Sequence, residues 1–149
     1  MTQAATEFIT PLTLQVLSQR LVGLDIMQEP DPSKVNHINI AKETDLFLLA
    51  PATANTIAKL ANGLADNMVT ATALALPSHT KKILAPAMNT QMYENPITQQ
   101  NIDRLKLTGW KTIEPREAIL ACGDQGKGAL AEIDTIIDTV KELIYEKTI

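Results

Sequence analysis

Residues 46–56, which read LFLLAPATANT, decide the predicted fold of this chain. The first five are apolar, which is the pattern of a strand buried on both faces, and Pro51 ends the run. Thr53 can then cap a helix that closes at Gly63, in the usual place for a helix-ending glycine. A buried strand followed directly by a helix is the repeating unit of a parallel α/β sheet.

The same pattern recurs along the rest of the chain. Residues 82–85 and 110–113 are predicted to be two further strands, and 22–32 an irregular connection. Further helices are expected at 10–18 (largely buried), 33–43, 66–76 (capped by Asp66), 96–109 and 132–146. Strands alternating with helices favour one Rossmann-like (flavodoxin-like) α/β domain over residues 1–149, with a parallel sheet covered by helices on both faces.

Composition narrows the function classes. The chain has 149 residues, 45% hydrophobic content and a net charge of −4, so it lacks a basic footprint for nucleic acid. No apolar run is long enough to span a bilayer, and no secretory signal pattern opens the chain. A single cysteine forms neither an internal disulfide nor a cysteine metal cluster, so no metal is expected and a cytoplasmic location is the simplest fit.

Three polar or glycine-rich segments follow predicted strands, at residues 51–56, 86–93 and 121–128. Ligands of open α/β sheets bind outside the carboxyl ends of the strands. We therefore expect the three segments to contribute to one composite site.

The first two segments each allow a functional and a structural interpretation. Thr53, Asn55 and Thr56 stand at a helix start, where free N–H groups attract anions, although simple capping explains them equally well. Asn89 can bind a carboxylate or orient a carbonyl. Met88 and Met92 could pack against a flat ring or merely fill core gaps, and Tyr93 is expected to be a surface aromatic.

The third segment holds the only cysteine, Cys122, among Gly123, Gly126 and Gly128. This glycine density indicates a mobile flap or a backbone nest, and the thiol is either reactive or inert. Elsewhere, His37 beside the apolar face of its helix is either a structural side chain or an acid/base group, and His79 is expected in a solvated loop.

Taken together, the segments resemble the flavin-containing cysteine decarboxylases, most closely those acting on phosphopantothenoylcysteine in coenzyme A biosynthesis. The resemblance runs in order over nearly the whole chain. It is carried by His37-Ile38 with Ala41, by APATANT at 50–56 with Lys59, by GLADN at 63–67, by PAMNTQM at 86–92, and by ACGD at 121–124 with Gly126 and Gly128.

The resemblance implies a lyase with bound FMN, a homotrimer, and phosphopantothenoylcysteine as the small-molecule substrate. It implies His37 as active-site base and Cys122 as proton donor. It implies substrate contacts by Asn89, Met92, Ala121 and Gly123. It implies cofactor contacts by Thr2, Thr53, Ala54, Asn55, Thr56, Asp66 and Met88.

The sequence departs from the family pattern in two places. It starts with Met1-Thr2-Gln3, which resembles the end of the family's second strand. The family's first strand, its phosphate-binding turn and the following helix are then expected to be truncated or supplied by another chain, and the present chain is expected to bind FMN weakly or not at all. Ala129 stands where many members carry arginine. Two alternatives stay open: a non-catalytic flavin-binding regulatory subunit, and a decarboxylase of peptides that end in cysteine.

Overall fold

The computed structural model describes residues 1–145, which form two compact units. The first unit comprises Met1–Thr44 and Gly63–Ser78, and the second comprises Asp45–Asn62 and the chain from His79 onward. Each unit is described by itself.

The second unit is built on a parallel sheet, as predicted. Its strands are β1 (Leu46–Ala52), β2 (Lys81–Pro86) and β3 (Trp110–Thr112), in the order β1-β2-β3. Leu48 pairs with Ile83 in the β1–β2 register. Consecutive parallel strands require crossover connections, and helices supply them here.

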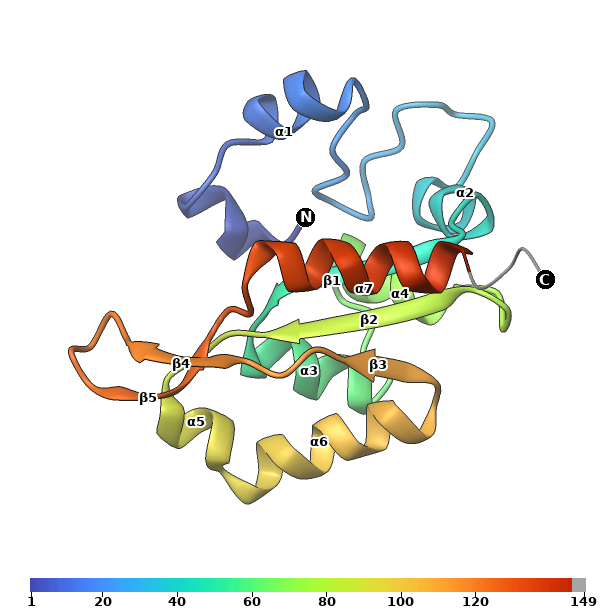
Figure 1. Ribbon diagram of the computed structural model, residues 1–149. Helices are drawn as coiled ribbons and strands as arrows, with labels where there is room; N and C mark the ends of the chain where they lie inside the picture. Colours follow the sequence, from blue (N-terminus) through green and yellow to red (C-terminus); the bar gives the residue numbers. More distant parts are fainter. Residues whose placement is uncertain (146–149) are drawn as a thin grey trace. The chain divides into compact units, whose positions relative to one another are not determined.

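Helices cover both faces of this sheet. They are α3 (Ala54–Ala61), α5 (Thr90–Glu94), α6 (Pro96–Leu107) and α7 (Ile133–Tyr145). In Figure 1, α7 crosses one face, while α3, α5 and α6 lie on the opposite face. The prediction of helices on both faces is confirmed. The short helix α5 was not predicted. Glu146, the predicted end of the last helix, lies outside the described residues.

Part of the core of the second unit lies between the sheet and α7. One buried cluster there contains Ile83, Ala85, Ile113, Ala131 and Ile136. Further side chains are buried on α3 and α6, among them Ile57, Ile102 and Leu105. Burial of β2 is therefore confirmed.

Burial of β1 on both faces is wrong for the described residues. Leu48 is 39% exposed, and only Ala52 of this strand is fully buried. The reason is position, because β1 forms an edge of the described sheet and β2 lies at its centre.

The glycine-rich segment belongs to a regular hairpin. Strands β4 (Arg116–Ile119) and β5 (Gln125–Ala129) pair in antiparallel fashion. The hairpin lies beyond the carboxyl end of β2 and beside α5 (Figure 1). Glycine is depleted in strands, so β5, with Gly126 and Gly128, carries no local strand signal.

The first unit contains a 3-10 helix η1 (Gln3–Glu7) and the helices α1 (Pro11–Ser18), α2 (Asn36–Lys42) and α4 (Met68–Leu74). Helices α2 and α4 pack together. Residues 22–32 are irregular, as predicted.

Three expectations for the first unit need correction. The start of α1, with Thr10 as cap and Pro11 as first residue, is confirmed, but the helix is not buried, and Leu17 is 76% exposed. The helix predicted at 33–43 begins only at Asn36. The N–H and hydroxyl of Ser33 both donate to the Asp31 carboxylate, and these bonds hold Ser33 in a turn before the helix.

The cap of α4 is Asn67 rather than Asp66. The Asn67 Oδ1 accepts bonds from the N–H groups of Val69 and Thr70, and the Thr70 side chain accepts from the Asn67 N–H to complete a capping box. Aspartate and asparagine are equally good caps, so the sequence alone does not choose between neighbours.

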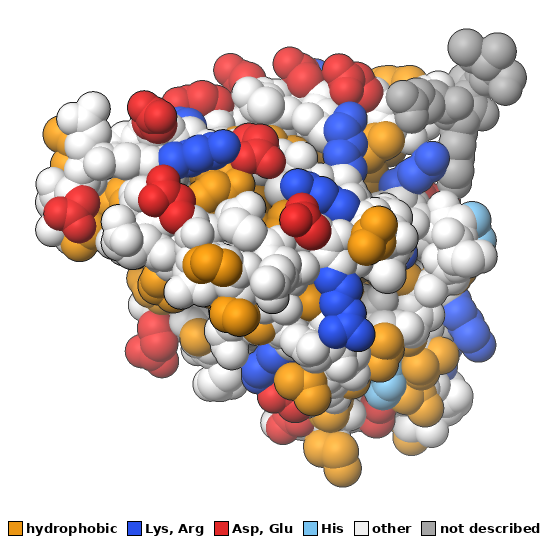
Figure 2. All heavy atoms as spheres, turned by 90° about the horizontal axis from the view of Figure 1, so that it is seen from below, with side chains coloured by type: hydrophobic (Ala, Val, Ile, Leu, Met, Phe, Trp, Pro, Cys, Tyr) orange, Lys and Arg blue, Asp and Glu red, His pale blue; other side chains and the backbone are white. Residues whose placement is uncertain are grey.

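Within residues 1–145, no helix combines the length and apolarity needed to cross a membrane. On the face shown in Figure 2, Lys and Arg side chains are scattered among Asp and Glu side chains rather than gathered into a basic surface. This distribution agrees with the small net charge of −4.

Candidate functional site

A pocket of about 360 Å³ lies in the second unit, where the segment after β2 meets the hairpin β4–β5. It is lined by Met88, Asn89, Leu120, Ala121, Cys122 and Gly128. The fold thus joins two of the three segments selected from the sequence, as parallel-sheet topology predicts.

Asn89 and Cys122 face each other in this pocket. Asn89 is the cap of α5, and its Oδ1 accepts a bond from the Gln91 N–H at 2.9 Å. This bond fixes the side chain so that its Nδ2 donates to the Cys122 Sγ at 3.3 Å. The exposed thiol also contacts the Asp124 carboxylate at 3.4 Å. An amide donor beside a thiol can hold an anionic group within reach of a proton source.

The hairpin docks backbone against backbone on the segment that carries Asn89. The Met88 N–H donates to the Gly128 carbonyl oxygen at 2.9 Å. A Cβ on Gly128 would collide with the Met88 carbonyl oxygen, and one on Gly126 would collide with the Thr90 side chain. These two glycines therefore permit the two backbones to approach closely. The expectation of a mobile flap at this segment stays a prediction.

An ionic cluster holds the hairpin from the side. The Tyr93 hydroxyl donates to Glu114 Oε2 at 2.8 Å, and the Lys127 ammonium donates to the same oxygen at 2.7 Å. Burial and this bond raise the pKa of Tyr93, while Lys127 holds the pKa of Glu114 below its ordinary value. Tyr93 is only 6% exposed, so the expectation of a surface aromatic is wrong.

Sequence reasoning missed Glu114, Lys127 and the role of Tyr93. Their separations of 13 and 21 residues match neither helical nor strand periodicity. No sequence signal available from one chain joins them.

The predicted capping role of Thr53 is confirmed. Its Oγ1 accepts from the Thr56 N–H at 3.3 Å at the start of α3. The N–H groups of Ala54 and Asn55 come first in the helix, where helical geometry provides no intrahelical acceptor. The Ala87 N–H donates to the Ala52 carbonyl oxygen at 3.0 Å, which joins this helix start to the Asn89 segment.

Other predicted site residues of the second unit have different positions. Ala121 lines the pocket, and Gly123 turns the hairpin tip with φ +88°. Met92 lies on α5 at 50% exposure and is not among the pocket-lining residues.

The remaining predicted site residues lie in the first unit. His37 is part of α2, and its Nδ1 is buried without a hydrogen-bond partner among the described residues. Thr2 caps η1 by accepting from the Ala5 N–H, and Asp66 accepts from Asn67 Nδ2 at 3.0 Å. His79, in the second unit, is exposed as expected.

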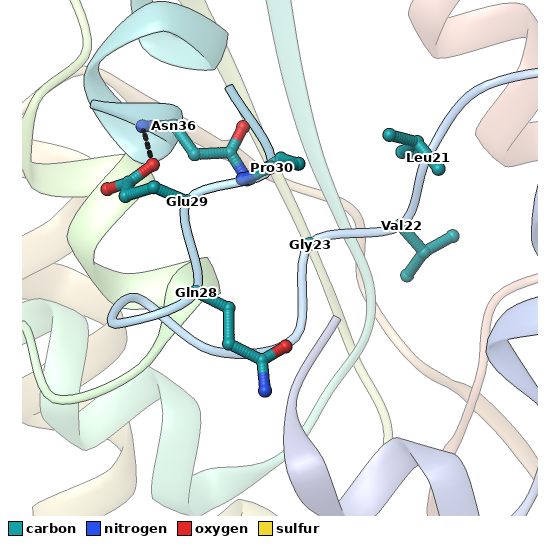
Figure 3. Close-up of a pocket in the computed structure, with 7 residues that line it drawn as sticks. All are labelled: Leu21, Val22, Gly23, Gln28, Glu29, Pro30 and Asn36. Carbon is teal, nitrogen blue, oxygen red and sulfur yellow. Dashed lines mark hydrogen bonds between the residues drawn. The ribbon is translucent and has the colours of Figure 1, made fainter. Parts of the chain in front are cut away.

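The first unit also contains a pocket of about 450 Å³. Figure 3 shows its lining residues Leu21, Val22, Gly23, Gln28, Glu29, Pro30 and Asn36. The Glu29 carboxylate accepts from the Asn36 N–H at 2.7 Å and so closes the loop onto the start of α2 (Figure 3).

Comparison with known proteins identifies the relatives of this chain. A family model described as Flavoprotein matches residues 1–145. The chain is 61% identical over 142 residues to a probable phosphopantothenoylcysteine decarboxylase of Streptococcus mutans, covering 95% of this chain and 79% of that protein.

Longer relatives match as well. The chain is 45% identical to the coenzyme A biosynthesis bifunctional protein CoaBC of Bacillus subtilis, covering 99% of this chain. It spans only 36% of that relative's length.

Solved structures agree with these matches. A PPC decarboxylase mutant complexed with pantothenoylaminoethenethiol superposes with a TM-score of 0.73 at 39% identity, covering 80% of this chain and 64% of that one. The FMN binding protein AtHal3 superposes with a TM-score of 0.80 at 34% identity, covering 99% and 80%.

Proposed function

The chain belongs to the flavoprotein family, and from that premise we propose that it is an FMN-dependent lyase that decarboxylates phosphopantothenoylcysteine to phosphopantetheine in coenzyme A biosynthesis. The proposed substrate is supported by the names of two relatives, a probable phosphopantothenoylcysteine decarboxylase and a PPC decarboxylase mutant complexed with pantothenoylaminoethenethiol. One observation carries the proposal: Asn89 Nδ2 lies 3.3 Å from Cys122 Sγ in a pocket large enough for a small ligand.

The described residues fit a flavin. The first N–H groups of α3, at Ala54 and Asn55, are donors suited to an anionic or polar ligand atom. Thr90 Oγ1 is buried and has no hydrogen-bond partner among residues 1–145, so the Asn89 segment also keeps an unused polar atom. Met88 lines the pocket and can pack against a ring. We therefore assign Thr53 to Thr56 and Met88 as cofactor contacts.

The reaction needs an electron acceptor beside the departing carboxylate. FMN held at the start of α3 and by Met88 would supply reversible two-electron redox chemistry for the substrate thiol. A thiol oxidised to the C=S level would provide a group that can take up the electrons as CO₂ leaves. The chain's own residues bind, orient and protonate the substrate around this chemistry.

Asn89 is assigned to the substrate carboxylate. Its Nδ2 is a neutral donor, so it can orient the carboxylate without the positive charge that would stabilise it against CO₂ loss. The bond from the Gln91 N–H to Oδ1 keeps this donor aimed at the pocket. Ala121 and Gly123 on the hairpin, and Met92 on α5, are proposed as further substrate contacts.

Cys122 is assigned as the proton donor that ends the cycle. The enethiolate left by CO₂ loss needs a proton on carbon, and a thiol is a sufficiently strong acid to supply it. The Asp124 carboxylate, 3.4 Å from Sγ, accepts from the thiol and orients it.

The roles of Thr2, His37 and Asp66 remain predictions of the family resemblance. The unpartnered Nδ1 of His37 supports its assignment as a base, because a buried ring nitrogen of purely structural purpose normally has a partner. A homotrimer or higher homo-oligomer is likewise proposed from the resemblance, and light scattering after size-exclusion chromatography tests it. A cytoplasmic location is proposed from the single cysteine.

A matched pair of asparagine variants tests the proposed function. Asn89 and Asn95 are both helix caps whose Oδ1 accepts from the N–H two residues ahead at 2.9 Å. Aspartate preserves such a cap. Asn89→Asp removes the Nδ2 donor and adds a charge that repels a carboxylate, whereas Asn95→Asp changes neither pocket nor hairpin.

With FMN supplied, the wild-type chain and Asn95→Asp should convert phosphopantothenoylcysteine to phosphopantetheine at similar rates. Asn89→Asp should be slower by about 10- to 100-fold, the equivalent of about 1.5–3 kcal/mol for a bond to a charged group. Product formation is followed by mass spectrometry. A wild-type chain that binds FMN but releases no CO₂ would favour a regulatory subunit, and turnover only of cysteine-terminated peptides would favour the peptide decarboxylase.

A further inference from the structure

The hairpin that carries Cys122 is joined to the rest of the second unit by the cluster of Glu114, Tyr93 and Lys127. We propose that Glu114 is a positioning residue for Cys122, because it binds Lys127 and Tyr93 together and so holds hairpin β4–β5 closed over Asn89. The inference rests on the proposed function, which gives Cys122 its role as proton donor.

Glu114 has a rigid base. Its neighbours Ile113 and Pro115 are both buried, and the Ile113 N–H donates to the Leu84 carbonyl oxygen at 2.8 Å. Ile113 is also part of the hydrophobic core of this unit. The backbone of Glu114 is therefore held by the sheet and is independent of the hairpin.

One carboxylate oxygen of Glu114 serves two elements. Oε2 accepts from the Tyr93 hydroxyl of α5 at 2.8 Å and from the Lys127 ammonium of β5 at 2.7 Å. The Lys127 ammonium also lies 5.5 Å from the centre of the Tyr93 ring, at cation–π distance. Departure of the lysine thus breaks an ion pair and a ring contact at once.

Lys127 transmits this hold to the catalytic thiol. It sits between Gly126 and Gly128, whose backbones lie against Thr90 and Met88. In the antiparallel register, Lys127 of β5 lies opposite Glu117 of β4. The hairpin tip that carries Cys122 connects these two strands. Opening at Lys127 would move the tip away from Asn89.

The cluster should stabilise the docked hairpin only modestly, so that the hairpin can still open. The side chains of Lys127 and Glu114 are 39% and 54% exposed, so water screens the pair. A hold of this strength lets substrate enter and then favours the closed arrangement. We expect effects of about three- to tenfold on its removal, within the range of exposed ion pairs and charge-assisted hydrogen bonds.

The test uses Glu114→Gln, Lys127→Met and the double variant. Glu142→Gln is the matched control, since it removes a comparably exposed ion pair with Lys111 at 3.6 Å that does not touch the hairpin. If Glu114→Gln does not fold, Lys127→Met, on the exposed hairpin, removes the same interaction and decides the matter.

The first readout is hydrogen exchange of the Met88 amide, which bonds Gly128 only when the hairpin is docked. Glu114→Gln and Lys127→Met should each speed it about three- to tenfold, and the double variant no more than either. The second readout is the product ratio. CO₂ release should continue while the oxidised enethiol rises relative to phosphopantetheine, because only delivery of the Cys122 proton is impaired.

Three results would overturn the proposal. The first is a wild-type rate of Met88 amide exchange in both single variants, and the second is an unchanged product ratio. The third is an equal acceleration of exchange at the Ile113 amide, which would mean that Glu114 stabilises the whole unit. Failure of the wild-type chain to decarboxylate would instead contradict the proposed function. The exchange measurement would still decide whether Glu114 holds the hairpin.

Discussion

Gly128→Ala should open the pocket by forcing the hairpin away from the Asn89 segment. A Cβ at residue 128 would collide with the Met88 carbonyl oxygen and lie 3.3 Å from the Thr90 nitrogen. Both neighbours are backbone atoms, which cannot rotate aside as a side chain would. The Met88–Gly128 hydrogen bond, at 2.9 Å, would have to lengthen or break.

The magnitude follows from three contributions. Overpacking costs about 1–3 kcal/mol and the lost hydrogen bond about 0.5–1.5 kcal/mol. Replacing glycine by alanine also lowers the conformational entropy of the unfolded chain, which offsets about 0.4–1 kcal/mol of this loss. The net loss is then about 2 kcal/mol, or roughly a 30-fold rise in the open population of the hairpin.

Hydrogen exchange at the Met88 amide measures this opening directly, and phosphopantetheine formation should fall with it. Gly109→Ala is the control, because Gly109 has φ +88° and its nearest neighbour to a Cβ is 3.9 Å away. It should lower the melting temperature through backbone strain of about 1–2 kcal/mol without opening the hairpin. Wild-type Met88 protection and turnover in Gly128→Ala would refute the docking argument.

Four further predictions follow from the same structure. Cys122→Ser should release CO₂ but accumulate the enethiol, because a hydroxyl is a far weaker acid; normal phosphopantetheine yield would contradict its role. His37→Asn should slow turnover about 10²- to 10⁴-fold at an FMN occupancy equal to that of the wild-type chain, measured by flavin absorbance, and a lower occupancy would indicate a structural histidine. The contribution of Glu114 to hairpin docking, made through Lys127 and Tyr93, should be complete above the ordinary glutamate pKa of 4.5 and be lost as pH falls through the lowered pKa of Glu114. Met88 exchange, corrected for its intrinsic rate, should then rise about three- to tenfold, and an unchanged rate would contradict this. Ile83→Ala, at a fully buried core position, should cost about 2–5 kcal/mol in denaturant unfolding, and a smaller loss would mean that the core closes around the cavity.

Local patterns in the sequence were sufficient for the elements that build the sheet. The strand β2, the proline start of α6 and the Thr53 cap were all predicted, because each depends on residues within one or two turns of each other. The sequence also selected Asn89 and Cys122, since polar groups at strand ends mark sites in this fold class. The segments that carry them were expected from topology to contribute to one site, and the two side chains, 33 residues apart, lie within hydrogen-bond distance.

Burial was less predictable than secondary structure. An apolar helix such as α1 reads as a core helix, yet the described structure leaves it exposed. The apolar run of β1 reads as a central strand, yet it forms an edge. Periodicity reports which residues share a face, whereas burial depends on what the fold places against that face.

Only the tertiary structure decided how the hairpin is held. Gly126 and Gly128 carry no sequence mark that separates close approach from flexibility, and the difference lies in Met88 and Thr90, which are distant in the chain. Glu114 likewise looks like any exposed acid until β5 and α5 bring Lys127 and Tyr93 to the same oxygen. The physical reason is that a hydrogen bond depends on distance in space, which the sequence determines only through the complete fold.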